Sequence, residues 1–164
     1  MSNHFECDVV IIGGCGHVGL PLAVAFAERG ARVVSYDIGA EAVEAVNDGR
    51  LPFREPAAEL PLRRAVSAGR LVASADPAVV AAAEHVIVII SGLDEHAPGR
   101  PDSIRAALAR CSDQFRDGQI LISRSVVTPG TTAIAEKMVR RHPHVFGTAE
   151  IGRASCRERV STIV

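Results

Sequence analysis

The sequence predicts an α/β fold in which about six parallel strands form a doubly wound sheet with helices on both faces. Short runs rich in Val and Ile, above all residues 8–12 and 85–90, have the composition of strands that are buried on both sides. Apolar helical stretches alternate with these runs, as in β-α-β units with right-handed crossovers. Because the chain has 164 residues, of which 48% are hydrophobic, it can bury one core and make one domain.

The elements are expected in a regular order along the chain. Residues 8–12 form the first strand, and the helix that follows at 17–29 is apolar on most sides and ends at Gly30, a residue suited to a helix C-terminus. Further strands are expected at residues 32–37, 71–74, 85–90 and 119–123. Further helices are expected at residues 40–47, 57–68, 77–83, 102–115 and 129–141, with a loop rich in Gly and Pro at 91–101.

Composition argues against several classes of protein. The net charge of −1 gives no electrostatic basis for binding nucleic acid. The longest apolar runs are too short to cross a bilayer, and the first residues do not resemble a signal peptide. The cysteines (Cys7, Cys15, Cys111 and Cys156) form no C-x-x-C pair, and the histidines lack partners for a metal. We therefore expect no disulfide, no metal site and a cytoplasmic location.

A glycine pattern follows the first strand. Residues 9–23 read VVIIGGCGHVGLPLA and fit G-x-G-x-x-G at Gly14, Gly16 and Gly19, between a predicted strand and a predicted helix, which is the context that a dinucleotide-binding turn requires. Gly14 is expected to permit the sharp turn out of the strand, and Gly19 to let the helix pack closely on the sheet. Gly16 is expected to let a pyrophosphate approach the backbone at the helix N-terminus.

Asp37 supports this interpretation from the end of the second predicted strand. A carboxylate there can bind the adenosine ribose hydroxyls and repels a 2′-phosphate, which favours NAD over NADP. The sequence therefore predicts a Rossmann domain that binds NAD. A Rossmann-like fold with an empty or different pocket is the alternative.

Four segments carry a family resemblance through their order and spacing. They read GGCGHVGLPLA, GRLPFREPAAEL, VIVIISGLDEHAPGRPD and SRSVVTPGTT. Together they resemble the nucleotide-sugar 6-dehydrogenases of the UDP-glucose and UDP-N-acetylmannosamine type, over roughly residues 5–149. The resemblance implies an NAD-dependent oxidoreductase of surface polysaccharide biosynthesis. Such an enzyme converts the C6 alcohol of a UDP-sugar to a carboxylate through an aldehyde and a cysteine thioester. Either UDP-sugar fits the motifs.

The resemblance also implies roles for individual residues. It implies pyrophosphate contacts from the backbone between Gly14 and Gly19, including His17 and Val18, and places Asp37 on the adenosine ribose.

Ser91 lies where the family has a Thr that meets the cofactor. The family's Thr in Ser-Thr-Val is Val126 here, which cannot form a hydrogen bond, and we expect Ser125 beside it to cover part of that role. Strand-end capping is the alternative for both serines.

The end of the chain departs from the family. The family's catalytic Cys, Lys, Asn, Asp and Glu belong to segments that this chain does not contain, and Cys156 has different neighbours, so no catalytic residue is assigned. Residues 150–160, EIGRASCRERV, back-translate, apart from the first base, to the reverse complement of a common sequencing adapter. We therefore expect residues 1–149 to be an NAD-binding fragment of a larger enzyme and residues 150–164 to be a non-native tail. The fragment is expected to be inactive and to lack the element through which the family forms homodimers.

Two other functions stay open. A stand-alone NAD-binding or redox-sensing module without dehydrogenase activity would need neither a catalytic half nor the Thr that Val126 replaces. Another NAD enzyme, such as a 3-hydroxyacid or 6-phosphogluconate dehydrogenase, is the third possibility. The segments LDEHAPGRPD and RSVVTPGTT argue against it.

Overall fold

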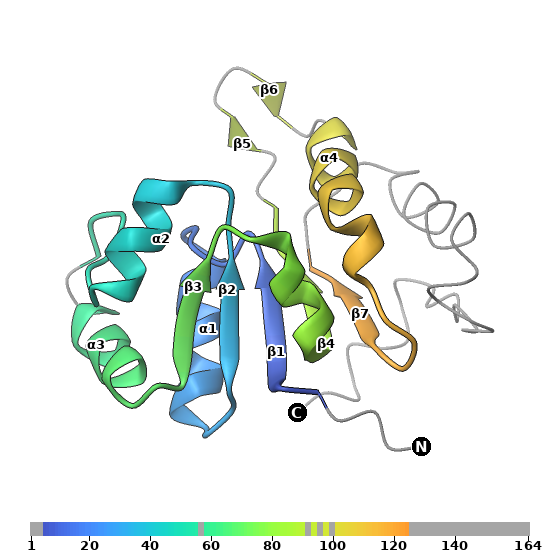
Figure 1. The fold of residues 1–164 in the computed structure, drawn as a ribbon. Coiled ribbons are helices and arrows are strands. Elements are labelled where there is room, and N and C mark those ends of the chain that lie inside the picture. The colour runs from blue at the N-terminus through green and yellow to red at the C-terminus, as the bar shows by residue number, and fades with distance from the viewer. Residues whose placement is uncertain (1–4, 56–57, 91–92, 95–96, 99–100, 125–164) are drawn as a thin grey trace, which may run out of the picture.

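The structure is a computed structural model that describes residues 5–55, 58–90, 93–94, 97–98 and 101–124 (Figure 1). Its elements are, in chain order, β1 (Cys7–Ile12), α1 (Gly19–Glu28), β2 (Val33–Tyr36), α2 (Ala40–Asn47), α3 (Glu59–Ser67), β3 (Leu71–Ser74), the 3-10 helix η2 (Pro77–Ala82), β4 (Ala83–Val88), β5 (Leu93–Asp94), β6 (Ala97–Pro98), α4 (Pro101–Cys111), the 3-10 helix η3 (Ser112–Gln114) and β7 (Ile120–Ser123).

Five of these strands form one sheet in the order β3-β2-β1-β4-β7, and every neighbouring pair is parallel. From β1 the chain builds outward first through β2 and β3, and then on the other side through β4 and β7. This confirms the doubly wound α/β fold. The order reverses direction between β1 and β4, and in such sheets ligands bind at the carboxyl ends of the strands at that point.

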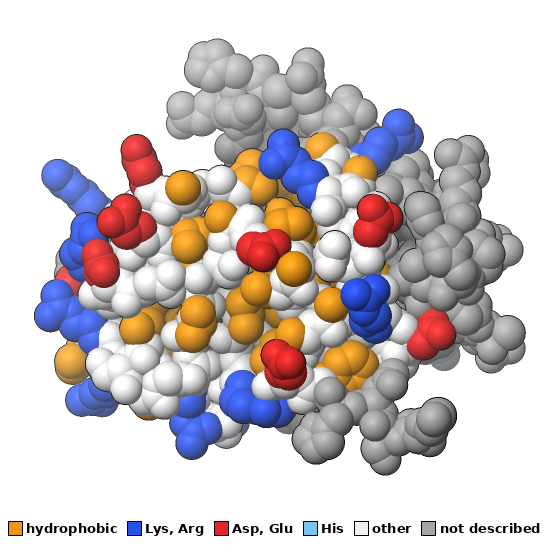
Figure 2. All heavy atoms as spheres, in the orientation of Figure 1, with side chains coloured by type: hydrophobic (Ala, Val, Ile, Leu, Met, Phe, Trp, Pro, Cys, Tyr) orange, Lys and Arg blue, Asp and Glu red, His pale blue; other side chains and the backbone are white. Residues whose placement is uncertain are grey.

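Each face of the sheet has its own core. Val9 and Ile11 of β1 pack with buried residues of α1, α2 and α3, whereas Val10 and Ile12 pack with buried residues of η2 and α4. This alternation is the two-residue period of a strand. Figure 1 shows α1 behind the strands and η2 in front of them. On the face seen in Figure 2, acidic and basic side chains are interspersed with apolar ones.

The C-terminal end of α1 agrees with the sequence, although the helix begins at Gly19 and not at residue 17. Gly30 follows α1 with a φ of 96°, a left-handed conformation that glycine adopts without strain. Its N–H donates to Ala27 O at 3.0 Å, and the N–H of Ala31 donates to Phe26 O at 3.1 Å. These two bonds are the Schellman pair, so the prediction that Gly30 ends the helix is confirmed.

Several boundaries differ from the prediction. The strand expected at residues 85–90 lies at Ala83–Val88, because its register is set by β1, where Cys7 pairs with Ala83 and Ile12 pairs with Val88. The helix expected at 77–83 is a 3-10 helix, a form common in short connections. The loop expected at 91–101 contains the antiparallel pair β5 and β6. The helix expected at 129–141 and any sixth strand of the sheet lie outside the described residues.

Among the helices that the structure describes, none combines the length and the apolar composition needed to span a bilayer.

Candidate functional site

The turn between β1 and α1 brings several glycines into close contact with neighbouring backbone. Gly13 has a φ of 81°, and a Cβ added there would lie 2.0 Å from Ile89 O, just beyond β4. A Cβ on Gly19 would lie 2.2 Å from Gly13 O. Both contacts are far below van der Waals distance and involve backbone, so any side chain would displace the turn. The sequence predicted that Gly19 would let the helix pack closely on the sheet, whereas the close contact at Gly19 is with the backbone of the turn itself, at Gly13 and Gly14.

Gly14 serves a different purpose from the one predicted. The left-handed backbone of the turn lies one residue earlier, at Gly13, which the glycine pattern leaves out. Gly14 instead lies against β2, where an added Cβ would be 2.7 Å from both Cα and Cβ of Ser35. Its requirement is therefore steric, and it brings the turn directly onto the neighbouring strand.

Gly16 is the glycine that internal packing does not require. A Cβ added there would meet only Gly13 O, at 3.7 Å, which is an ordinary contact. Gly16 also lines a pocket of about 360 Å³. A glycine on a pocket wall that the fold itself does not need is what close approach of a ligand to the backbone predicts. The residues present therefore fit a dinucleotide.

Asp37 joins the turn to the end of β2. Its Oδ2 accepts a hydrogen bond from Cys15 N at 3.1 Å, and its Oδ1 accepts one from Gly39 N at 3.2 Å. The carboxylate is half-buried and lines the same pocket as Gly16. An ionised carboxylate has about four acceptor positions, so two of them remain for a ligand.

The pocket lies where the topology places a ligand site, at the carboxyl ends of β1, β2 and β4. The turn contributes Gly13 and Gly16, the end of β2 contributes Asp37 and Ile38, and α4 contributes Arg110. The remaining walls are apolar and consist of Ile12, Tyr36, Ile89, Ile90, Ala106 and Ala107. A concave apolar site with two charged groups on its walls suits a small ligand that has both a flat base and polar hydroxyls.

Of the other predicted site residues, the structure describes His17 and Val18 but not Ser91 and Ser125. Val18 is the N-cap residue of α1 and is 47% exposed, and no side chain of the described residues caps this helix. His17 is exposed, and its ring stacks on Phe53, a contact that the sequence gave no reason to expect. Ser91 and Ser125 lie outside the described residues.

The thiols of the described residues do not form a reactive site. Burial raises the pKa of Cys7 to about 11 and the pKa of Cys15 to about 12, and it also raises the pKa of Cys111. Thiols of this kind stay protonated at neutral pH and are poor nucleophiles. Within the same part of the chain, no three His, Cys, Asp or Glu side chains come together as metal ligands would.

Solved structures of nucleotide-sugar dehydrogenases resemble this fold. A UDP-D-ManNAc dehydrogenase from Pyrococcus horikoshii superposes with a TM-score of 0.73 at 28% identity, over 87% of this chain and 33% of that protein. A UDP-glucose dehydrogenase from Pyrobaculum islandicum superposes with a TM-score of 0.70 at 29% identity, over 89% of this chain and 35% of that protein.

Curated relatives agree with these structures. The NDP-N-acetyl-D-galactosaminuronic acid dehydrogenase of Ralstonia nicotianae is 31% identical over 98% of this chain. The UDP-N-acetyl-D-mannosamine dehydrogenase of Pyrococcus horikoshii is 32% identical over 86% of this chain. The chain spans 40% of the first relative's length and 33% of the second's. Residues 7–162 match the UDP-glucose/GDP-mannose dehydrogenase family, NAD binding domain. The chain therefore belongs to this family of NAD-dependent oxidoreductases and corresponds to its NAD-binding domain.

Proposed function

We propose that the chain binds NAD across the carboxyl ends of β1, β2 and β4, as the cofactor half of an enzyme that oxidises the C6 alcohol of a UDP-sugar to a carboxylate. NAD, when bound, supplies the acceptor for the hydride that leaves the sugar carbon. The observation that carries the proposal is Gly16, which lines the pocket while packing leaves its Cβ position open.

The pyrophosphate and the adenosine ribose of the dinucleotide each have a proposed partner. The backbone from Gly14 to Gly19, including His17 and Val18, binds the pyrophosphate at the start of α1, where helix N–H groups and the helix dipole favour negative charge. The first turn of α1 holds no acidic residue that would compete for these groups. Asp37 binds the ribose hydroxyls through the acceptor positions that Cys15 and Gly39 leave free.

Two serines extend this proposal beyond the described residues. Ser91 is assigned to the cofactor, since it stands where the family has a cofactor-contacting Thr. Ser125 is assigned part of the role of the family's other Thr, which Val126 beside it replaces.

We propose further that this chain alone does not oxidise a sugar. It spans well under half the length of its curated relatives, and no catalytic cysteine or lysine is assigned to it. The substrate class, a UDP-linked sugar, and a homodimeric parent enzyme are carried over from the family as proposals. The free thiols of Cys7, Cys15 and Cys111 favour a reducing compartment such as the cytoplasm.

The boundary between residues 149 and 150 is also a proposal. It rests on the adapter-like coding of residues 150–160, whereas the family match continues to residue 162. Long-read sequencing of the source DNA across codon 149 tests it directly. A reading frame that continues into different residues supports a non-native tail, whereas the same fifteen codons followed by a stop would show that the tail is native.

The NAD proposal is tested by titrating the chain with NAD and NADP in a calorimeter. Gly16→Ala should leave the melting temperature unchanged, because the added Cβ has room, and should weaken NAD binding at least about tenfold. Gly39→Ala is the comparison for an added methyl group near the site: its Cβ also has room, 3.6 Å from Ala42 and 3.7 Å from Asp37 Oδ1, and Gly39 does not line the pocket, so it should weaken NAD binding less than Gly16→Ala does. Undiminished NAD binding by Gly16→Ala would refute the proposed site.

A further inference from the structure

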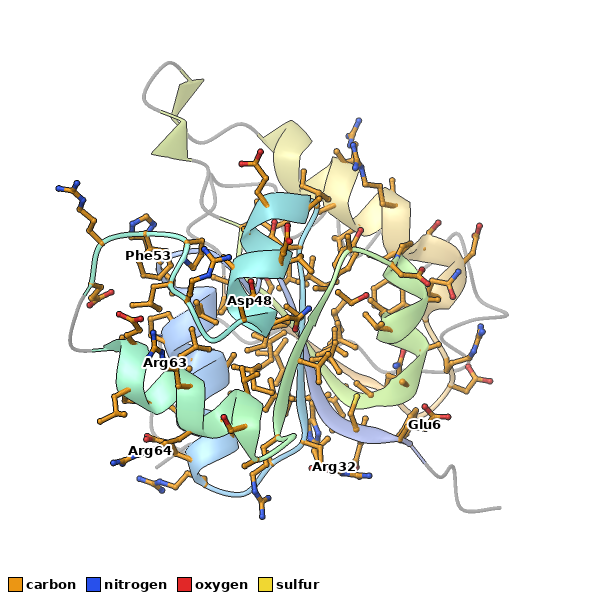
Figure 3. The ribbon with its side chains drawn as sticks, turned by 60° about the vertical axis from the view of Figure 1, so that its left-hand side comes forward. Glu6, Arg32, Asp48, Phe53, Arg63 and Arg64 are labelled. Atoms are coloured by element: carbon orange, nitrogen blue, oxygen red, sulfur yellow. The ribbon has the colours of Figure 1, made fainter. Side chains whose placement is uncertain are left out.

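His17, on the glycine turn, lies face to face with a ring from a distant part of the chain. The ring centroids of His17 and Phe53 are 4.1 Å apart and the ring planes differ by 22°. Phe53 belongs to the connection between α2 and α3, and Figure 3 shows it at the edge of the molecule near α1 and α2. Neither residue lines the pocket, so this contact braces the turn from outside the pocket.

Phe53 is the anchored member of the pair. It is half-buried, and together with Leu51 it packs against the core cluster formed by α1, α2, α3 and the sheet. The same connection is fixed where it begins, because Arg63 of α3 donates from Nε to Gly49 O at 3.3 Å. Arg63 is itself held by Glu59, with a distance of 2.7 Å between Nη2 and Oε1. The His17 side chain, in contrast, is exposed and stacks on Phe53.

The contact with Phe53 can affect the proposed pyrophosphate site because His17 is itself part of the turn between β1 and α1. It lies between Gly16, which has no side chain to fix its conformation, and Val18, the N-cap residue of α1. Holding the His17 ring restricts rotation about its Cα–Cβ bond and limits motion of the two peptide units beside it. Those two units carry N–H groups at the proposed pyrophosphate site.

We propose that Phe53 is a positioning residue for the pyrophosphate of the dinucleotide, acting through the stacked ring of His17. The inference rests on the proposed function, since it requires that the dinucleotide bind at this turn. It differs from a purely structural role for Phe53, in which the ring only fills the core beside Leu51.

The test compares Phe53→Leu, which keeps an apolar side chain but removes the ring, with Phe53→Tyr, which keeps the ring. Phe26→Leu is the matched control, because Phe26 is partly buried against the same core cluster but stacks on no described ring. Each variant of the full chain is titrated with NAD, with ADP-ribose and with adenosine, which lacks the pyrophosphate. Phe53→Leu should weaken NAD and ADP-ribose binding about two- to tenfold, the range expected for an aromatic pair, and leave adenosine binding unchanged.

A second readout requires no ligand. The imidazole protons of His17 should be shifted upfield by the Phe53 ring in NMR spectra of the free chain. The shift should vanish in Phe53→Leu and persist in Phe53→Tyr and Phe26→Leu. His17→Ala should weaken NAD binding as much as Phe53→Leu does, and the double variant should bind no more weakly than either, since both changes remove one contact.

The outcomes distinguish a failure of this inference from a failure of the proposed NAD binding. A wild-type chain that binds no NAD overturns both. A wild-type chain that binds NAD, with Phe53→Leu binding it equally well, overturns the inference alone. The inference is also overturned by an equal loss of adenosine binding in Phe53→Leu, or by an unshifted His17 resonance in the wild type.

Discussion

Removing the hydroxyl of Ser35 on β2 should increase the stability of the fold, provided that the side chain at this position stays small. The residue is fully buried, and its Oγ has no hydrogen-bond partner among the described residues. A buried polar group left unpaired costs about 1–3 kcal/mol. Ser35→Ala removes that group with almost no change in shape, so we expect the free energy of unfolding to rise by about 1 kcal/mol or more.

A larger side chain at position 35 should lower the free energy of unfolding, because the glycine turn packs directly on Ser35. A Cβ on Gly14 would already be 2.7 Å from the Cα and Cβ of Ser35, so there is no spare room between the turn and β2. Ser35→Val adds branching at this contact, and overpacking of this kind typically costs about 1–3 kcal/mol. It should also weaken NAD binding, because the displaced element is the turn that faces the ligand.

The assay is chemical unfolding combined with thermal unfolding of the wild type and the two variants. For a chain of this size, 1 kcal/mol corresponds to a change of about 2–4 °C in melting temperature. Ser112→Ala serves as the control, because the Ser112 hydroxyl already donates to Ala109 O at 3.0 Å and its loss should stabilise nothing. If Ser35→Ala lowers the stability, the hydroxyl makes a hydrogen bond in solution and the reasoning from its isolation is wrong.

Three further predictions concern other parts of the fold. Asn47→Ala should destabilise the chain by about 1–3 kcal/mol in a denaturant titration, because the Asn47 amide accepts from Ala73 N (2.8 Å) and donates to Ala73 O (2.9 Å) on β3. The hydrogen bond from Arg32 lowers the pKa of Asp8 below its ordinary value of 3.8, so the pair stabilises the fold above about pH 4 and this contribution is lost as the pH falls through the lowered pKa. Arg32→Met removes the side-chain bonds but keeps the bond from Arg32 N to Asp8 Oδ2 (2.7 Å), so it should flatten the acid limb of a stability–pH curve in part; an unchanged limb would show that the side-chain pair contributes nothing. Because Cys7, Cys15 and Cys111 are buried and their pKa values are raised, iodoacetamide should not label them at neutral pH until denaturant is added. Rapid labelling of any of them in the native chain would instead favour a redox-sensing role.

The sequence was sufficient to predict those features that depend on local pattern. The apolar runs predicted the strands of the parallel sheet, and the glycine pattern with Asp37 marked the carboxyl ends of β1 and β2. Boundaries within a continuous apolar run were less accessible. HVIVII carries no signal for where pairing stops, and β4 ends at Val88 because its partner β1 ends at Ile12.

The contacts that shape the site depend on residues far apart in the chain, which is why the sequence could not show them. Gly13 and Gly14 are adjacent glycines, and only the fold shows that Gly13 has the left-handed backbone and lies against Ile89 O. Phe53 reads as an ordinary apolar residue in a connection, and only the fold brings it onto His17.

The turn between β1 and α1 is thus held by several other elements before any ligand arrives. Ile89 O, just beyond β4, lies against Gly13, and Ser35 of β2 lies against Gly14. Asp37, just after β2, accepts a hydrogen bond from Cys15 N. Ordering a loop upon binding consumes part of the binding free energy, whereas a loop ordered by the fold leaves that free energy for the ligand. Gly16 is the glycine of this turn whose Cβ position is not closed off by such a contact, which is why the pyrophosphate is proposed to approach the backbone there.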